Sequence, residues 1–133
     1  MRAMMLAATA SLDRNPAPLT LVRVPRPEPG QGEILIEVSV CGVCHTELDE
    51  IEGRTAPPRL PVIPGHEIVG RVVENGPGCR RYQPGRRVGV GWIQSSTGAQ
   101  DENLSDEFRA TGRDADGGYA EFVVVPERYV YPI

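Results

Sequence analysis

Two short segments of the sequence carry side chains that bind metal ions in proteins. The first is Cys41-Gly42-Val43-Cys44-His45-Thr46-Glu47-Leu48-Asp49, and the second, further along the chain, is Gly65-His66-Glu67. Zinc is bound by thiolate, imidazole and carboxylate groups that converge from different parts of a chain. Cys44 and His66 would supply two such ligands, and Glu67 could supply a third. Three protein ligands leave one position open for water or a substrate, as a catalytic zinc site requires.

Other interpretations of the same residues stay open at this point. Cys41 and Cys44 alone could be a redox pair or half of a structural zinc site, although the absence of a second Cys-x-x-Cys excludes a four-cysteine site. His66 could be a buried, hydrogen-bonded histidine at the start of a strand. The chain has three cysteines, and an odd number in an apparently intracellular protein argues against a disulfide framework.

The composition excludes several other kinds of function. All 14 basic residues are arginine, so no lysine is available for Schiff-base or general-base chemistry. The net charge of −4 is spread along the chain without a basic stripe, which argues against a nucleic acid partner. No stretch approaches the roughly 20 apolar residues of a membrane span. We therefore expect a soluble, cytoplasmic protein with no membrane partner.

The elements that position these residues are predicted to be short strands joined by turns. Glycine (15 residues) and proline (13 residues) are abundant for a chain of 133 residues, which favours many turns over long helices. Runs of apolar residues predict strands at 4–8, 19–24, 33–41, 65–75, 85–92, 118–126 and 129–131. The pattern is typical of a mainly β domain, either a small barrel or a sandwich. The G-x-G-x-x-G fingerprint of a dinucleotide-binding fold is absent.

Two segments next to the metal-binding residues have clearer patterns. In residues 33–41, Ile34, Ile36, Val38 and Val40 alternate with more polar positions, which predicts a strand with one buried face. Residues 44–52 have the composition of one or two helical turns. Residues 95–107 are polar and show no periodicity, so no element is predicted there.

The metal-binding segments belong to a longer series of motifs. The series continues through Leu60-Pro61-Val62-Ile63-Pro64-Gly65-His66-Glu67-Ile68-Val69-Gly70, Gly76-Pro77-Gly78, Pro84-Gly85-Arg86-Arg87-Val88-Gly89-Val90-Gly91-Trp92 and Asp116-Gly117-Gly118-Tyr119-Ala120-Glu121-Phe122. In content and order these motifs resemble the zinc-containing alcohol dehydrogenase family of the medium-chain dehydrogenases. The resemblance covers nearly the whole chain.

The resemblance implies a single domain over residues 1–133, a GroES-like, partly open β-barrel with short helices. It implies a catalytic zinc ion held by Cys44, by His66 and by a second cysteine further along. Glu67 would lie beside the metal and could approach it. Thr46 would hydrogen-bond the alcohol and begin a proton relay, and His45 would lie near the pyrophosphate of NAD(P). Small alcohols and aldehydes would be the substrates, with hydride passing to a nicotinamide on a neighbouring domain.

The sequence departs from the family pattern at several points. The position of the second zinc cysteine lies beyond Ile133, so Glu67 or water would replace it. The dinucleotide-binding domain is missing, so we expect no dehydrogenase activity from this chain alone. Residues 92–108, where many members carry four cysteines for a structural zinc, contain none and suggest an engineered, trimmed domain. Asp49 stands where the relay often has histidine, and its carboxylate has a different pKa from that of imidazole.

The sequence also allows two alternative functions and predicts that the chain associates with itself. An open zinc site could hydrolyse activated esters weakly, or the domain could be a non-catalytic GroES-like barrel. The zinc-free quinone reductase branch is disfavoured, because it lacks the ligands that Cys44 and His66 represent. Without a covering domain, an exposed apolar face is expected to cause self-association.

Overall fold

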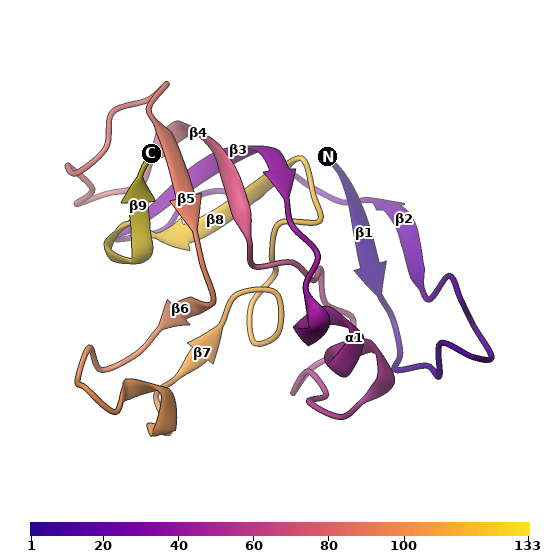
Figure 1. Cartoon of the computed structure of the whole chain (residues 1–133). Helices are drawn as coiled ribbons and strands as arrows, with labels where there is room; N and C mark the ends of the chain where they lie inside the picture. The colour runs from indigo at the N-terminus through magenta and orange to yellow at the C-terminus, as the bar shows by residue number, and fades with distance from the viewer.

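A curled antiparallel sheet of five strands forms the body of the molecule. The computed structural model describes residues 1–133 (Figure 1), and the strand order in this sheet is β8-β3-β4-β5-β9. These strands are β3 (Glu33–Cys41), β4 (Ile68–Asn75), β5 (Arg87–Val90), β8 (Phe122–Pro126) and β9 (Val130–Pro132). The sheet bends into half of a barrel, so the expectation of a mainly β, partly open barrel is confirmed.

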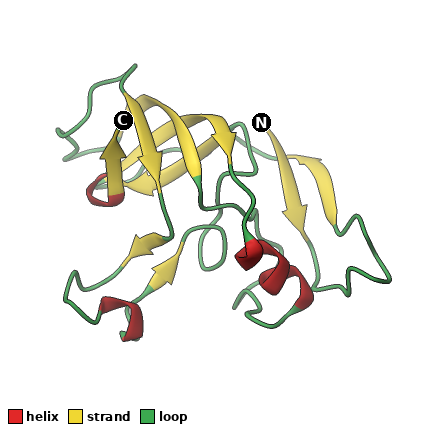
Figure 2. Ribbon diagram, in the orientation of Figure 1, coloured by secondary structure: helices red, strands yellow, loops and turns green.

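Smaller elements surround this sheet. Two further pairs of antiparallel strands are β1 (Arg2–Leu6) with β2 (Leu19–Arg23), and β6 (Ile93–Ser95) with β7 (Arg109–Ala110). The helix α1 (His45–Glu52) lies beside β1 in Figure 2, and short 3-10 helices span Glu102–Leu104 and Glu127–Tyr129. No helix of the chain is both long enough and apolar enough to cross a lipid bilayer.

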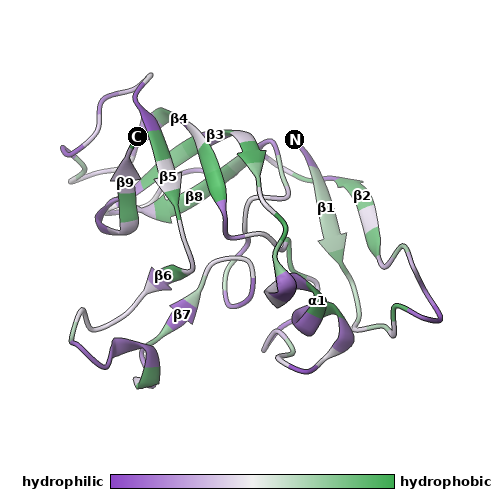
Figure 3. Cartoon of the chain, in the orientation of Figure 1, coloured by the Kyte–Doolittle hydropathy of each residue, from purple (hydrophilic) through white to green (hydrophobic).

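The main core lies inside the curl of the sheet. Hydrophobic residues concentrate along its strands (Figure 3), and ten buried side chains form one cluster there. Burial of each large apolar side chain contributes about 1.5–3 kcal/mol to folding. A second, smaller cluster joins Leu6 of β1, Ile51 of α1 and Val62, and it holds the helix against the first hairpin. The helix is therefore fixed by its packing on β1 rather than by the sheet.

The strand β3 departs from the regular alternation that its sequence predicts. Ile34 and Ile36 are buried as expected, but Leu35 is also fully buried and Val40 is 57 % exposed. The pairing of β3 with β4 is irregular between Leu35 and Ile36 and again between Val38 and Val40. Such bulges shift the side-chain alternation along a strand, so the prediction of one buried face is wrong for Leu35 and Val40.

The segment between β5 and the last strands also contains structure that the sequence did not indicate. Residues 95–107 were expected to form no element, yet β6 and a 3-10 helix occupy part of this region. Their strands and turns have only two or three residues, which is too short for a hydrophobic period to be visible. Ser96 anchors the region, because its carbonyl accepts hydrogen bonds from Tyr129 Oη and Arg128 Nη2.

Three glycines let two distant loops approach each other closely. A Cβ at Gly117 would lie 2.1 Å from the carbonyl oxygen of Gly65 and 2.7 Å from Cα of Gly112. The amides of Gly117, Gly118 and Tyr119 donate to the carbonyls of Ile63, Gly65 and Pro64, at 2.7, 2.8 and 3.0 Å. The loop containing Gly117 therefore fixes the segment that leads into His66.

We predict that Gly117→Ala destabilises the chain and shifts the backbone before His66. The added Cβ would collide with backbone atoms, and overpacking of this kind costs about 1–3 kcal/mol. Chemical denaturation measures the loss. Gly89→Ala is the matched control, because a Cβ there meets nothing closer than 3.8 Å. Equal stabilities for the two variants would contradict this account of the loop contact.

Exposed apolar side chains give the expected self-association a concrete origin. Leu21 is 65 % exposed, Val40 57 % and Val43 72 %. We predict that the sedimentation coefficient of the chain rises with concentration, because contact between such side chains removes apolar surface from water. The double variant Val40→Thr/Val43→Ser should weaken this dependence. A concentration-independent monomer in sedimentation velocity would disprove the expectation.

Candidate metal centre

Cys44 is the N-cap residue of α1, and the helix start holds its sulfur in place. The backbone of Cys44 is extended, and Sγ accepts a hydrogen bond from the N–H of Thr46 at 3.3 Å. Oε2 of Glu47 accepts a hydrogen bond from the N–H of Cys44 at 2.8 Å. This is a capping box with cysteine at the position of the usual serine or threonine. An amide donor and the positive end of the helix thus face the sulfur, which suits an anionic ligand atom.

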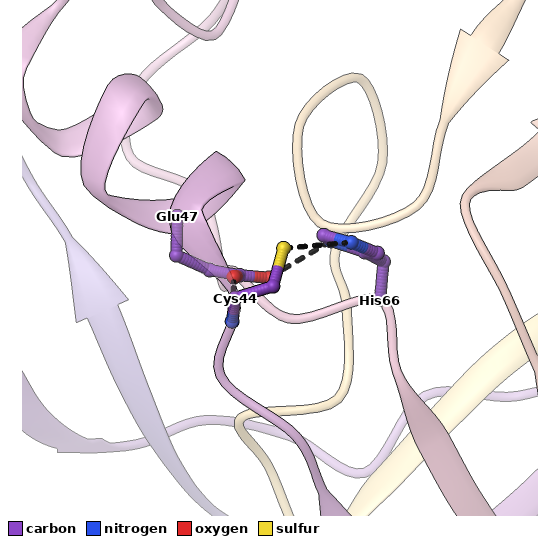
Figure 4. A group of neighbouring side chains, drawn as sticks. All are labelled: Cys44, Glu47 and His66. Carbon is purple, nitrogen blue, oxygen red and sulfur yellow. Dashed lines mark hydrogen bonds and ion pairs between the residues drawn. The ribbon is translucent and has the colours of Figure 1, made fainter.

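His66 lies opposite Cys44, in the segment just before β4. Its ring is almost fully buried and meets the ring of Trp92 edge to face, with 4.9 Å between the centroids. Nε2 is 3.5 Å from Sγ of Cys44, and Nδ1 is 2.8 Å from Oε1 of Glu47 (Figure 4). The two residues that the sequence proposed as zinc ligands therefore face each other.

Glu47 connects the two sides of this site. It is 1 % exposed; one carboxylate oxygen accepts from the N–H of Cys44, and the other lies beside Nδ1 of His66. Glu47 was not among the residues that the sequence predicted to lie at the metal site. The signal was present, because Cys44-x-x-Glu47 has the spacing of a capping box, and that spacing predicts a carboxylate returned to the helix start.

The distances between these atoms fit a metal ion. Zinc binds sulfur at about 2.3 Å and nitrogen at about 2.0–2.1 Å with tetrahedral angles, which places two such ligand atoms about 3.6 Å apart. The distance from Sγ of Cys44 to Nε2 of His66 is 3.5 Å. Ligand atoms of Cys44, Glu47 and His66 all lie within 4.8 Å of one another. The donor set therefore suits zinc.

Glu67 lies outside this group of three. Its side chain is exposed and its carboxylate rests against Gly42, where any side chain would collide with it. The backbone carbonyl of Glu67 accepts a hydrogen bond from the N–H of Gly42 at 2.8 Å, which ties the His66 segment to the end of β3. The structure brings Glu47, not Glu67, to the two facing ligand atoms, and the role of Glu67 as a ligand stays a prediction.

Two of the predicted relay residues share one cleft, which Trp92 connects to His66. Thr46 and Asp49 line a cleft of about 530 Å³ together with Trp92. Asp49 is paired with Arg54, and its Oδ1 is 3.7 Å from Nε2 of His45. The imidazole of His45 is 78 % exposed. Because Asp49 already accepts from Arg54, one of its oxygens is partly engaged, and its assignment to the relay stays a prediction.

The other two cysteines have structural surroundings. Both pack against the main core, and Sγ of Cys79 donates to the carbonyl of Glu33 at 3.1 Å. Burial raises the pKa of the Cys41 thiol to about 11, which keeps it protonated at neutral pH. All three cysteines are free. These contacts support packing roles for Cys41 and Cys79.

Glu50 is a buried carboxyl group without a partner. It is 1 % exposed, and neither oxygen of its side chain has a hydrogen-bond partner. Burial, reinforced by the charge of Glu47, raises the pKa of Glu50 to about 7, although Arg113 opposes the shift. The neighbouring acids Asp114 and Asp49 act in the same direction as Glu47. The helix therefore carries a buried acid that is partly protonated at neutral pH.

This acid predicts a pH dependence of stability. The unfolded carboxyl releases its proton near its ordinary value of 4.5, whereas the folded one keeps it to about 7. The free energy of unfolding should therefore fall as the pH rises from 4.5 to 7 and stay low above that. At about 1.4 kcal/mol per pKa unit, discounted for partial solvation, the loss is about 1–3 kcal/mol.

Denaturation of the metal-free chain at pH 5 and pH 8 measures this loss, and Glu50→Gln should abolish it. Glu107→Gln removes an exposed acid instead and should leave the pH dependence unchanged. An unaltered pH profile in Glu50→Gln would show that this carboxyl titrates normally.

A half-barrel that holds a facing cysteine and histidine defines the class of this protein, a mainly β domain with a candidate metal site. The comparisons then give the family. Residues 30–133 match the family model of the alcohol dehydrogenase GroES-like domain. The chain belongs to this family.

Similar proteins include several alcohol dehydrogenases. The chain is 41 % identical over 131 residues to the "Probable alcohol dehydrogenase AdhA" of Mycobacterium tuberculosis, covering 90 % of this chain and 37 % of that protein. It is 40 % identical over 123 residues to an alcohol dehydrogenase of Geobacillus stearothermophilus, covering 87 % and 36 %. The cobalt- and zinc-bound thermostable alcohol dehydrogenase of Pyrobaculum aerophilum has a similar structure, with a TM-score of 0.86 at 29 % identity. That match covers 99 % of this chain and 40 % of the other. The chain thus spans between a third and two fifths of the relatives it matches.

Proposed function

We propose that the chain is the zinc-site, catalytic domain of a zinc-dependent alcohol dehydrogenase, which interconverts alcohols with aldehydes or ketones. The observation that carries this proposal is the 3.5 Å separation of Cys44 Sγ and His66 Nε2, with Glu47 beside Nδ1 of the same ring. Family membership supports the same reaction class. The alcohol substrate, and NAD(P) as the hydride acceptor, are part of the proposal.

Cys44 and His66 would hold the zinc ion. A bound zinc ion supplies Lewis acidity, which lowers the pKa of an alcohol oxygen. Oε1 of Glu47 is 2.8 Å from Nδ1 of His66, and a small rotation of either side chain would let it accept the Nδ1–H, which would leave the lone pair of Nε2 free to bind a metal ion. A carboxylate in this position orients the ring and raises the basicity of the ligand. Glu67 or water would complete the ligand set.

The remaining residues would handle the substrate and its proton. Thr46 lies two residues after Cys44 and lines the cleft, so its hydroxyl can accept a proton from a bound alcohol and pass it outward. Asp49 and His45 lie further toward the surface and offer the next acceptors, 3.7 Å apart. The indole of Trp92 forms an apolar wall beside His66. His45 would also contact the phosphates of the nicotinamide cofactor.

The zinc site is tested by metal analysis of variants. We predict one zinc ion per chain, lost in both Cys44→Ala and His66→Ala because each removes a ligand atom. Glu47→Gln should weaken the site by about 10–100-fold, as expected when the group that orients a ligand histidine is changed. Cobalt substitution provides a second measurement, because the sulfur-to-cobalt absorption band requires Cys44. Cys79→Ala is the control, since Sγ of Cys79 donates to the carbonyl of Glu33, at the end of β3 opposite Cys41 and the metal centre.

Zinc binding that survives both ligand variants would overturn the proposal. Glu67→Gln answers a separate question, because a loss of affinity there would place Glu67 in the ligand set. Hydrolysis of an activated ester that stops on chelation would favour the hydrolase alternative. The expectation that residues 1–133 alone do not oxidise alcohols stays a prediction, to be measured with NAD(P) and a series of alcohols.

A further inference from the structure

The cleft beside the metal centre has an unusual lining for an alcohol site. It contains only two apolar side chains among its seven lining residues, which are Thr46, Asp49, Arg54, Thr55, Ala56, Trp92 and Arg113. Thr46 and Trp92 connect it to the metal centre, since the indole of Trp92 packs against the ring of His66. A ligand in this cleft therefore lies next to the proposed reaction centre and in contact with charged groups.

The two arginines of the cleft differ in how well their charges are matched. Arg54 donates to Asp49 and to Glu52, so its guanidinium is balanced on two sides. Arg113 has one acid within ion-pair distance, Asp114, with 3.7 Å between Nη1 and Oδ2. That same Oδ2 already accepts a hydrogen bond from the N–H of Ala110 at 2.8 Å. Arg113 is therefore only loosely paired.

The hydrogen-bonding capacity of Arg113 is also not fully used. Its Nε is buried and has no hydrogen-bond partner. Glu50 is close enough to interact with its charge, yet neither oxygen of Glu50 forms a hydrogen bond. A guanidinium offers five N–H donors in a planar arrangement that matches a carboxylate with two parallel bonds. The exposed part of Arg113 lies beyond its buried Nε, so its terminal Nη groups, with only the 3.7 Å contact to Asp114, are the donors that could bind an anionic ligand in the cleft.

We propose that Arg113 is a specificity residue that binds a carboxylate group on the substrate. The substrate class would be short hydroxy acids and the corresponding aldehyde or keto acids. The hydroxyl or carbonyl end would lie at Thr46 and the metal, and the carboxylate at Arg113. This inference rests on the proposed function, because it assigns a substrate class to the same site.

The test compares a carboxylate ligand with a neutral ligand of matched length. Trp92 is the sole tryptophan of the chain, so its fluorescence reports ligand binding in the cleft. We expect 4-hydroxybutyrate to bind the zinc-loaded chain at least tenfold more tightly than 1,4-butanediol. Arg113→Gln should remove this preference, and Arg113→Lys should keep part of it. Arg86→Gln, which changes an exposed arginine outside the cleft, should leave both affinities unchanged.

Several outcomes would overturn the inference. Equal affinity for the two ligands would do so, as would a preference that survives in Arg113→Gln. Inorganic phosphate is the third ligand: if it binds as tightly as the hydroxy acid and equally requires Arg113, the site recognises anions in general and not a substrate carboxylate. Circular dichroism confirms that each variant is folded before it is scored.

Measurements with and without zinc separate this inference from the proposed function. Stoichiometric zinc that needs Cys44 and His66, together with no preference for 4-hydroxybutyrate, would reject the inference and leave the zinc-site proposal standing. A preference that depends on Arg113 in a chain that binds no zinc would support the carboxylate site and reject the proposed function.

Discussion

The carboxylate of Glu47 is the contact on which the candidate site depends. One of its oxygens accepts the N–H of Cys44 and fixes the start of α1, while the other lies 2.8 Å from Nδ1 of His66. A single buried side chain thus sets both the position of the sulfur and the direction of the imidazole. Replacing it by a shorter or neutral group would free both ligands at once. The N–H of Cys44 satisfies one oxygen of this buried carboxylate, whereas Oε1 and Nδ1 of His66 lie close together without forming a hydrogen bond.

The rest of the fold keeps these two candidate ligands at a fixed separation. Cys44 follows β3 and His66 precedes β4, and these two strands pair in the centre of the sheet. The helix that carries Glu47 is held by the packing of Ile51 against Leu6 and Val62. Tyr119 adds a further connection, because its hydroxyl donates to the carbonyl of Gly42 at 3.3 Å and its ring covers Gly65. The site therefore lies where the sheet, the helix and the glycine loop meet.

Much of this arrangement could be predicted from the sequence, and the exceptions have physical reasons. The types of Cys44 and His66, together with the family motifs, indicated that they meet, and most strands lie close to their expected positions. Glu47 was not predicted near the two ligand candidates, because its place depends on how the helix start folds back on Cys44; Glu67 as a ligand stays a prediction. Glu50 lies among other acidic residues of α1, so the sequence suggests a solvent-exposed position, and only the packing of the helix shows that it is buried. The bulges of β3 leave no mark in its alternating sequence.

The loop containing Gly112 and Gly117 also affects the order in which parts of the chain can fold. The segment before His66 is bonded to residues far along the sequence, for example by the N–H of Ile63 to Asp116 Oδ1 at 3.0 Å, a separation of 53 positions. Closing so long a loop costs entropy before any contact compensates for it. The capped helix start that positions Cys44 can form from local contacts alone. The segment before His66, in contrast, is not fixed until residues 112–119 have docked against it. During synthesis on a ribosome, the metal centre would therefore be one of the last parts of the domain to be completed.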